Sequence, residues 1–223
     1  MRVAVLATGG KDSTLALYHV LKTRYDVKYL VTMIPTREDS WMFHYPNIGL
    51  VDLFAEAVGI PVVKAETLGV KEEELDDLER LVKTLDVEGI VSGAIASSYQ
   101  KTRIEKISKH LGLECIAPLW HRNPLDIMEE ILDLNFETIM TGVYACGFSK
   151  EWLGRKIDTS AVADLMELNR QYGVSLVGEG GEYETLVLDA PFFKKRIKIV
   201  EAEAVWKDPS GHLKIAKAEL ESK

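Results

Sequence analysis

The residues best suited to chemistry begin close to the N-terminus. Leu6–Thr14 has the sequence LATGGKDST and lies between an apolar run and a helical pattern. Adjacent glycines let a backbone approach a phosphate closely, and the first turn of a helix offers N–H groups with positive partial charge. Hydroxyls and a mobile lysine add donors, so the segment predicts a phosphate-binding loop. Its candidate binding residues are Thr8, Gly9, Gly10, Lys11, Asp12, Ser13 and Thr14.

The spacing of this loop differs from two common nucleotide-binding motifs. A Walker A loop needs G-x-x-x-x-G-K-[ST], whereas Lys11 follows an adjacent glycine pair directly. The dinucleotide motif G-x-G-x-x-G is also absent from the segment. Asp12 is compatible with a polyphosphate if it contacts Mg²⁺, and a helix-capping role is the other interpretation. An ordinary strand–helix turn capped by Asp12 or Ser13 is the alternative without a ligand.

A second segment follows the strand expected at 89–92. Gly93–Arg103 has the sequence GAIASSYQKTR, and helical spacing places Tyr99 and Gln100 beside Arg103. A guanidinium at the carboxyl edge of a parallel sheet can hold a phosphate or a carboxylate bidentately. Arg103 is therefore a binding and catalytic candidate, with a plain surface arginine as the alternative. The candidates of this segment are Gly93, Ser98, Tyr99, Gln100 and Arg103.

A third segment, Gly178–Thr185, has the sequence GEGGEYET. Three glycines among three carboxylates suit backbone with positive φ or a close approach better than they suit packing. Clustered acids indicate a bound cation or amine, or support for Mg²⁺. A plain acidic glycine loop is the alternative. The candidate substrate-binding residues are Glu179, Gly180, Gly181, Glu182, Tyr183, Glu184 and Thr185.

Four isolated residues have two interpretations each. Trp120 is either a core residue or an aromatic contact for a cation, and His44 either contacts substrate or lies on the surface. Cys115 and Cys146 lack C-x-x-C spacing, which argues against a zinc or disulfide framework. Both cysteines have apolar neighbours, so we expect them to be buried packing residues rather than a redox pair.

The elements that must position these segments alternate in the first half of the chain. Strands are expected at 2–7, 27–34, 61–66, 89–92 and 113–116, and helices at 13–24, 48–58, 71–85 and 98–111. Apolar strands alternating with helices predict an α/β fold with a doubly wound, mainly parallel sheet. Ligands of such folds bind at the carboxyl ends of the strands.

The pattern changes near residues 118–126, where we place a domain boundary. A nucleotide-binding domain is expected over 1–125 and a smaller α+β substrate-binding domain over 126–223. The second part predicts helices at 124–134 and 158–172, and strands at 185–188, 196–206 and 212–216. A turn is expected at 208–211, which has the sequence DPSG.

Length and composition limit the number of domains and the class of protein. The chain has 223 residues, which corresponds to about one and a half domains. With 47% hydrophobic and 28% charged residues it is globular, and a net charge of −8 argues against a protein that coats nucleic acid. No run reaches the roughly 18 apolar residues of a membrane span. The N-terminus lacks signal-peptide features, so we expect a cytoplasmic location.

The first segment resembles the SGGxDS pyrophosphate loop of the N-type ATP pyrophosphatases, with Thr8 in place of the usual serine. That resemblance implies ATP and Mg²⁺ as cofactors, with Asp12 contacting the metal. It also implies that backbone groups at the end of the second strand, at Thr32 and Met33, hold the adenine. With the second and third segments, SWMFH at 40–44 and DAPFFKK at 189–195, the whole chain is similar to the diphthine–ammonia ligase family.

This resemblance implies ATP-dependent amidation of the diphthine carboxylate on translation elongation factor 2, through an acyl-adenylate that yields AMP and pyrophosphate. The chain has no room for a glutaminase domain, so free ammonium is the expected nitrogen donor. The trimethylammonium of diphthine suits aromatic and acidic contacts. The implied catalytic residues are Lys11, Asp12, Ser13 and Arg103.

Two alternative functions stay open: adenylation of another carboxylate or small metabolite, and a nucleotide-binding regulator without catalysis. A homo-oligomer is compatible with the sequence; direct contact with nucleic acid is not expected.

Overall fold

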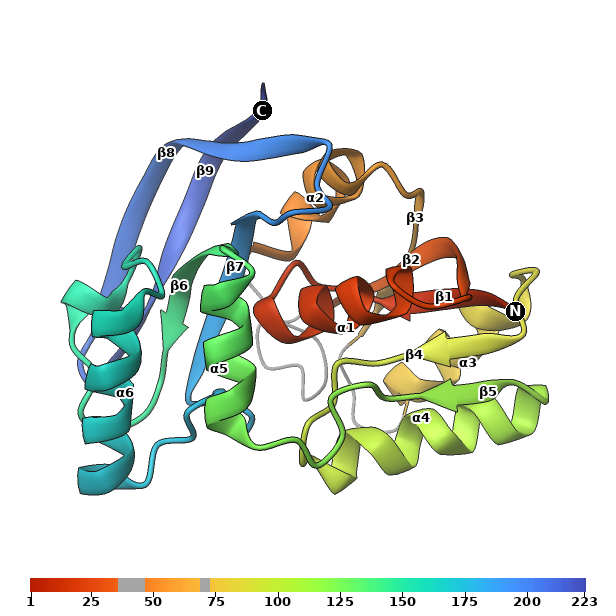
Figure 1. Cartoon of the computed structure of the whole chain (residues 1–223), viewed down its shortest axis with the longest axis horizontal. Coiled ribbons are helices and arrows are strands. Elements are labelled where there is room, and N and C mark those ends of the chain that lie inside the picture. The colour runs from red at the N-terminus through yellow and green to blue at the C-terminus, as the bar shows by residue number, and fades with distance from the viewer. Residues whose placement is uncertain (36–46, 69–72) are drawn as a thin grey trace. The chain divides into compact units, whose positions relative to one another are not determined.

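The computed structural model describes residues 1–35, 47–68 and 73–223 (Figure 1). Two compact units make up the chain, Met1–Trp120 and His121–Lys223. The division falls a few residues before the boundary expected at 125, ahead of the helix that starts at Pro124. Each unit has a sheet of its own.

The first unit is built on a five-stranded sheet in which every neighbouring pair is parallel. The strand order is β3-β2-β1-β4-β5, so the chain builds outward from β1 to one edge and then returns to build the other. This confirms the predicted doubly wound α/β fold, whose ligand position lies where the strand order reverses, between β1 and β4. The strands are β1 (Arg2–Leu6), β2 (Asp26–Pro35), β3 (Val62–Thr67), β4 (Gly89–Val91) and β5 (Glu114–Ile116).

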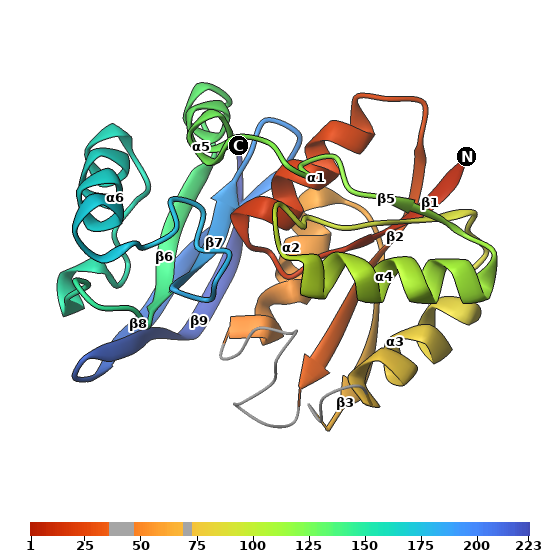
Figure 2. The same ribbon diagram turned by 90° about the horizontal axis from the view of Figure 1, so that it is seen from below.

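Helices cover both faces of this sheet (Figure 2). One face carries α1 and α2, and the other carries α3 and α4, which share a core with Ala4 and Ile90 of the sheet. The helix predicted over 98–111 is present with these bounds. It starts after Ser97, whose side chain caps it, and ends at Gly112, which takes a left-handed conformation. The helices are α1 (Lys11–Leu21), η1 (Asn47–Leu50), α2 (Val51–Val58), α3 (Glu73–Lys83) and α4 (Ser98–Leu111).

The second unit has a four-stranded antiparallel sheet in the order β7-β6-β9-β8. Both predicted helices and all three predicted strands of this part are present. The elements are α5 (Pro124–Asp133), β6 (Glu137–Val143), η2 (Lys150–Trp152), α6 (Thr159–Tyr172), β7 (Tyr183–Asp189), β8 (Lys195–Lys207) and β9 (Ser210–Ser222). No helix within the described ranges is long and apolar enough to cross a membrane.

Three features of the second unit differ from the sequence-based expectations. β6 was not predicted, because Thr138, Thr141 and Gly142 interrupt its apolar run although six of its seven residues are buried. β9 is longer than expected and pairs with β8 as far as Ser222, a stretch too charged to indicate a strand by hydrophobicity. The prediction of a buried Cys146 is wrong, since this residue is exposed in a turn that follows β6; Cys115 is half-buried in β5.

Helix α6 supplies a test of local stability. Asp158 caps it by accepting a hydrogen bond from the Ala161 N–H at 2.8 Å, and this bond is the main reason why the pKa of Asp158 lies below its usual value of 3.8. We expect Asp158→Ala to lower the free energy of unfolding by about 1 kcal/mol. The folded-state pKa is depressed, so the stabilisation is present above pH 3.8 and is lost as the pH falls through the lower folded-state value. Urea unfolding of both proteins at pH 7 and pH 3 checks this; an unchanged difference between the two pH values would contradict it.

Candidate functional site

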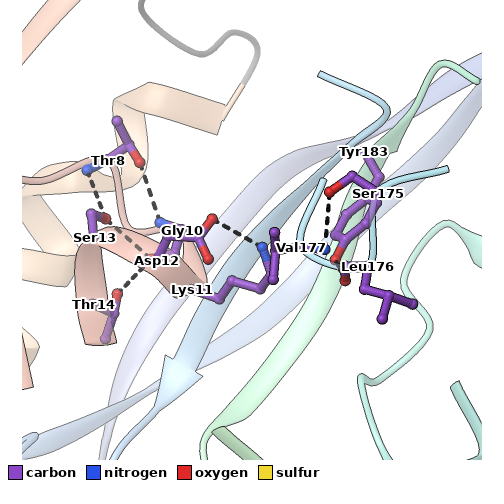
Figure 3. Close-up of polar contacts among 10 residues, drawn as sticks. All are labelled: Thr8, Gly10, Lys11, Asp12, Ser13, Thr14, Ser175, Leu176, Val177 and Tyr183. Atoms are coloured by element: carbon purple, nitrogen blue, oxygen red, sulfur yellow. Dashed lines mark hydrogen bonds and ion pairs between the residues drawn. The ribbon is translucent and has the colours of Figure 1, made fainter. Parts of the chain in front are cut away.

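The predicted phosphate loop joins β1 to α1, and its own hydroxyls order it (Figure 3). Gly9 has a φ of 81°, and Gly10 precedes the helix with no side chain capping it. The Ser13 hydroxyl donates to the Gly10 carbonyl at 3.1 Å and accepts from the Thr8 N–H at 3.4 Å. Thr14 donates its hydroxyl to the same carbonyl at 2.8 Å. The loop therefore presents the N-terminus of α1 in a preorganised form, which suits a polyphosphate.

Lys11 and Asp12 form an ion pair at the start of α1. Lys11 Nζ lies 2.9 Å from Asp12 Oδ2, and the lysine side chain is only 2% exposed (Figure 3). The expectation of a mobile lysine is therefore wrong: burial and the neighbouring carboxylate hold it in one place. A fixed cation beside the loop still adds positive charge where a phosphate would lie.

Gly93 brings the end of β4 against this loop. A Cβ atom at position 93 would lie 2.8 Å from both the Asp12 carbonyl carbon and the Ser13 nitrogen. Distances under 3.0 Å to backbone atoms cannot be accommodated without a shift of the backbone. The second sequence segment thus supports the first one by close approach at the switch point between β1 and β4, a role that the sequence analysis did not assign to Gly93.

Thr32 and Met33 lie in β2 with their side chains 2% and 1% exposed. The Thr32 hydroxyl donates to the Ala7 carbonyl, directly before the loop. Both side chains are committed to the sheet, so a ligand at this strand would meet backbone groups. That is the mode which the family resemblance implies for adenine.

Arg103 stacks on Tyr99, one helical turn earlier in α4. Its guanidinium carbon lies 3.4 Å from the centroid of the Tyr99 ring, and Nη1 donates to the Tyr99 carbonyl at 3.3 Å. The predicted i, i+4 contact is present, and it restricts the guanidinium plane. Within the same helix, Ser98 is exposed and Gln100 donates its N–H to the Ser97 hydroxyl at 3.3 Å.

Trp120 is half-buried, with Lys101 Nζ 4.6 Å from its ring centroid. It is therefore not one of the fully buried core residues. A cation of the chain itself already occupies a position over the ring. The other isolated candidate, His44, lies outside the described residues together with the rest of the 40–44 segment.

The third segment turns into β7 with two glycines in the left-handed region. Gly178 has a φ of 69° and Gly181 a φ of 80°, as the glycine content predicted. Gly180 is required for another reason, because a Cβ there would lie 2.9 to 3.0 Å from the Glu182 carboxylate. Thr185 lies in β7 opposite Met140 of β6.

The Tyr183 side chain is buried and packs within the second unit. This side chain is 3% exposed, and its hydroxyl donates to the Leu176 carbonyl at 2.6 Å (Figure 3). Its ring contacts the Phe148 ring edge-on, with 6.0 Å between the two centroids. The turn at 175–177 is further held by the bond from the Val177 N–H to the Ser175 hydroxyl at 3.4 Å. The aromatic contact that the sequence indicated for Tyr183 is thus made to the protein's own core.

Sequence reasoning missed Tyr144, which follows β6. Its N–H donates to the Glu182 carbonyl at 2.8 Å. Its hydroxyl lies over Gly142, so close that a Cβ at position 142 would be only 2.5 Å from the phenol oxygen. Glu184 is the β7 partner of Gly142, so the phenol and the carboxylate meet in a hydrogen bond. Burial and then the Glu184 charge raise the pKa of Tyr144 well above its usual range, which keeps the phenol protonated. Without β6, the sequence offered no signal that could pair these residues.

The described residues offer few side chains that could hold a permanently bound metal ion. Among the described residues no three His, Cys, Asp or Glu side chains are grouped closely enough to hold an ion. Asp12 is a single carboxylate beside the loop, already in contact with Lys11. Mg²⁺ is commonly held by one or two carboxylates together with substrate phosphates, and the loop fits a metal of that kind better than a protein-built cage.

A doubly wound sheet with an ordered glycine–hydroxyl loop at the first helix defines an α/β nucleotide-binding protein. Two family models divide the chain between them: the diphthamide synthase N-terminal domain matches residues 1–115, and the diphthamide synthase C-terminal domain matches residues 123–220. The chain belongs to the diphthamide synthase family.

Curated relatives agree with this assignment. The diphthine–ammonia ligases of Bos taurus and Homo sapiens are each 34% identical to this chain, over 100% of it and 94% of their own length. That of Saccharomyces cerevisiae is 31% identical over 87% of this chain and 34% of its own length. A solved structure of a predicted subunit of tRNA methyltransferase from Methanocaldococcus jannaschii aligns with 86% of this chain and 98% of its own, at 17% identity and a TM-score of 0.47.

Proposed function

We propose that this protein is the ATP-dependent ligase that joins ammonia to the diphthine carboxylate of translation elongation factor 2, the last step of diphthamide synthesis. The observation that carries the proposal is similarity over the full chain to diphthine–ammonia ligases at up to 34% identity. A translation factor as protein substrate would place the reaction in the cytoplasm.

The reaction sets a clear chemical demand. A carboxylate does not exchange its oxygen for ammonia without a better leaving group, and an acyl-adenylate supplies one. The substrate carboxylate would attack the α-phosphate of ATP, releasing pyrophosphate, and ammonia would then displace AMP. The protein's contribution is positioning and electrostatic stabilisation, since no side chain needs to become covalently attached.

The two units of the chain would have different roles in this reaction. The Thr8–Thr14 loop holds the β- and γ-phosphates through the N-terminus of α1, with the Lys11 cation offsetting charge on the departing pyrophosphate. Asp12 would share Mg²⁺ with the phosphates, and that ion would neutralise charge on them. Arg103, which stacks on Tyr99, would hold an anionic group. The second unit, with its Gly178–Thr185 segment, takes the substrates to be joined.

A product assay tests the proposal directly. Purified protein is incubated with ATP, ammonium chloride and diphthine-bearing elongation factor 2, and nucleotides are separated by chromatography. We expect AMP, pyrophosphate and a mass change of the factor that matches conversion of its carboxylate to an amide, all dependent on the three substrates together. Formation of ADP, or AMP formation that does not require the factor, would contradict it.

The Tyr144–Glu184 hydrogen bond gives a variant that keeps the fold. Tyr144→Phe removes the phenol donor while retaining the ring over Gly142, so Glu184 loses its fixed orientation. Hydrogen bonds to charged groups contribute about 1.5 to 3 kcal/mol, and we expect kcat for amidation to fall about tenfold. Steady-state kinetics with the factor as varied substrate measure this. Tyr172→Phe on the exposed end of α6 is the control, and equal rates for both variants would rule out a role for the bond.

A further inference from the structure

The three carboxylates of the Gly178–Thr185 segment have different surroundings. Glu184 is hydrogen-bonded to the Tyr144 phenol, and Glu179 has contacts of its own within the described chain. Glu182 is held by one oxygen: Oε1 accepts the Ser175 N–H at 3.1 Å. Its other oxygen, Oε2, is shielded from solvent and has no hydrogen-bond partner among residues 1–35, 47–68 and 73–223.

The backbone around Glu182 fixes this arrangement. Gly180 approaches the carboxylate so closely that a Cβ there would lie 2.9 Å from Oε1 and 3.0 Å from Oε2. Gly181, with a φ of 80°, reverses the chain between the two residues. A carboxylate with one oxygen on a backbone N–H and one oxygen without a donor is costly in a buried place, because an acceptor removed from water loses its hydrogen bonds. Such an oxygen requires a donor that residues 1–35, 47–68 and 73–223 do not supply.

The chemistry of the two cationic candidates separates them. The trimethylammonium of diphthine has no N–H group, so it can offset the charge of Glu182 but cannot hydrogen-bond to Oε2. Ammonium has four N–H donors and is small enough to lie against a single carboxylate oxygen. A charge-assisted hydrogen bond of this kind is among the stronger ones that a protein makes.

We infer that Glu182 Oε2 is the binding site of the ammonium co-substrate, with the Ser175 N–H holding the other oxygen of the same carboxylate. This inference rests on the proposed ligase function and assigns one residue to its nitrogen donor. The sequence indicated the Gly178–Thr185 segment for a cation or an amine but left open which carboxylate contacts substrate. Glu182 concentrates ammonium, and its carboxylate can accept the proton that ammonium must lose to become the nucleophile ammonia; the acyl-adenylate is formed without Glu182.

Glu182→Gln is the test variant, since it keeps the shape of the side chain. The amide oxygen can still accept the Ser175 N–H, and the amide NH₂ then stands where Oε2 was and presents donors to the ammonium donors. We expect the KM for ammonium chloride, measured at fixed pH and ionic strength, to rise about tenfold. The KM values for ATP and for the diphthine-bearing factor should stay within about twofold of the wild type.

The adenylation half-reaction separates the inference from the proposed function. Exchange of labelled pyrophosphate into ATP, measured with the factor and without ammonium, should be the same in wild type and Glu182→Gln. Glu129→Gln, an equivalent change on the exposed side of α5, serves as the matched control. Thermal melting confirms that each variant folds, and Glu182→Asp, which withdraws the carboxylate by one methylene, provides the same test if the amide variant does not fold.

The outcomes are distinct. Wild-type protein that forms no amide overturns the proposed function. An active wild type with an unchanged ammonium KM in the Glu182 variant overturns the inference alone. So does a parallel loss of pyrophosphate exchange, which would assign Glu182 to adenylation, or a raised KM for the factor only, which would assign it to the trimethylammonium.

Discussion

Replacing Asp12 by asparagine is expected to lower the rate of AMP formation about 100-fold while the fold is retained. Asp12 is the carboxylate of the phosphate loop, and its Oδ2 lies 2.9 Å from Nζ of a lysine that is 2% exposed. The amide keeps the size of the side chain but removes the charge that positions Lys11 and that would contact Mg²⁺. Loss of one preorganised electrostatic contact at a reacting centre costs about 10² to 10³ in rate.

The control for this variant is Asp26→Asn. Asp26 also pairs with a nearby lysine, Lys28, at 2.7 Å, but both side chains are exposed at the start of β2. Surface pairs contribute little, so AMP formation should be unchanged there. AMP release is followed with ATP, ammonium and the factor at saturation, and circular dichroism reports the fold. Near-normal turnover of the Asp12→Asn variant would show that this loop does not take part in ATP cleavage.

Replacing Gly93 by alanine is expected to weaken ATP binding about 30-fold. The new Cβ would lie 2.8 Å from backbone atoms of Asp12 and Ser13, and no flexible side chain can give way there. The first turn of α1 must move, and with it the N–H groups that would face the phosphates. Overpacking of this kind also costs about 1 to 3 kcal/mol of stability.

Gly49→Ala is the matched control, because a Cβ at that position would have no described atom within 4 Å apart from its own local backbone. Isothermal titration with ATP gives the affinity of each variant, and thermal melting gives the stability. A Gly93→Ala protein that binds ATP as the wild type does would show that β4 does not support the loop. Loss of stability without loss of affinity would contradict the prediction as well.

The loop at the N-terminus could be predicted from sequence because its determinants are local. Gly9, Gly10 and Ser13 act through backbone freedom and short-range hydrogen bonds, which depend only on residues within five positions. The ends of α4 were predictable for the same reason, since Ser97 and Gly112 cap the helix beside them. The parallel order of the first unit followed from the alternation of apolar strands and helices.

The third segment could be found but not interpreted from its composition. Its glycines pointed correctly to positive φ at two positions, yet the part each carboxylate plays depends on β6 and on the turn at 175–177. β6 carries two buried threonines and a glycine, so hydrophobic periodicity did not detect it. Tyr144, which depends on that strand, was missed with it, and the sequence could not indicate that Tyr183, a binding candidate, is buried.

The sequence by itself determined that this chain has a doubly wound nucleotide-binding half, a phosphate loop without a Walker lysine and the three segments of its family. These are features of spacing and local backbone freedom. Only the tertiary structure decided that Lys11 is buried against Asp12 and that Glu184 is held by Tyr144. It also decided that one oxygen of Glu182 has no donor within the described part of the chain. The physical reason is that burial and hydrogen-bond satisfaction depend on residues far apart in the chain, such as Gly142 and Glu184, which strand pairing alone brings together.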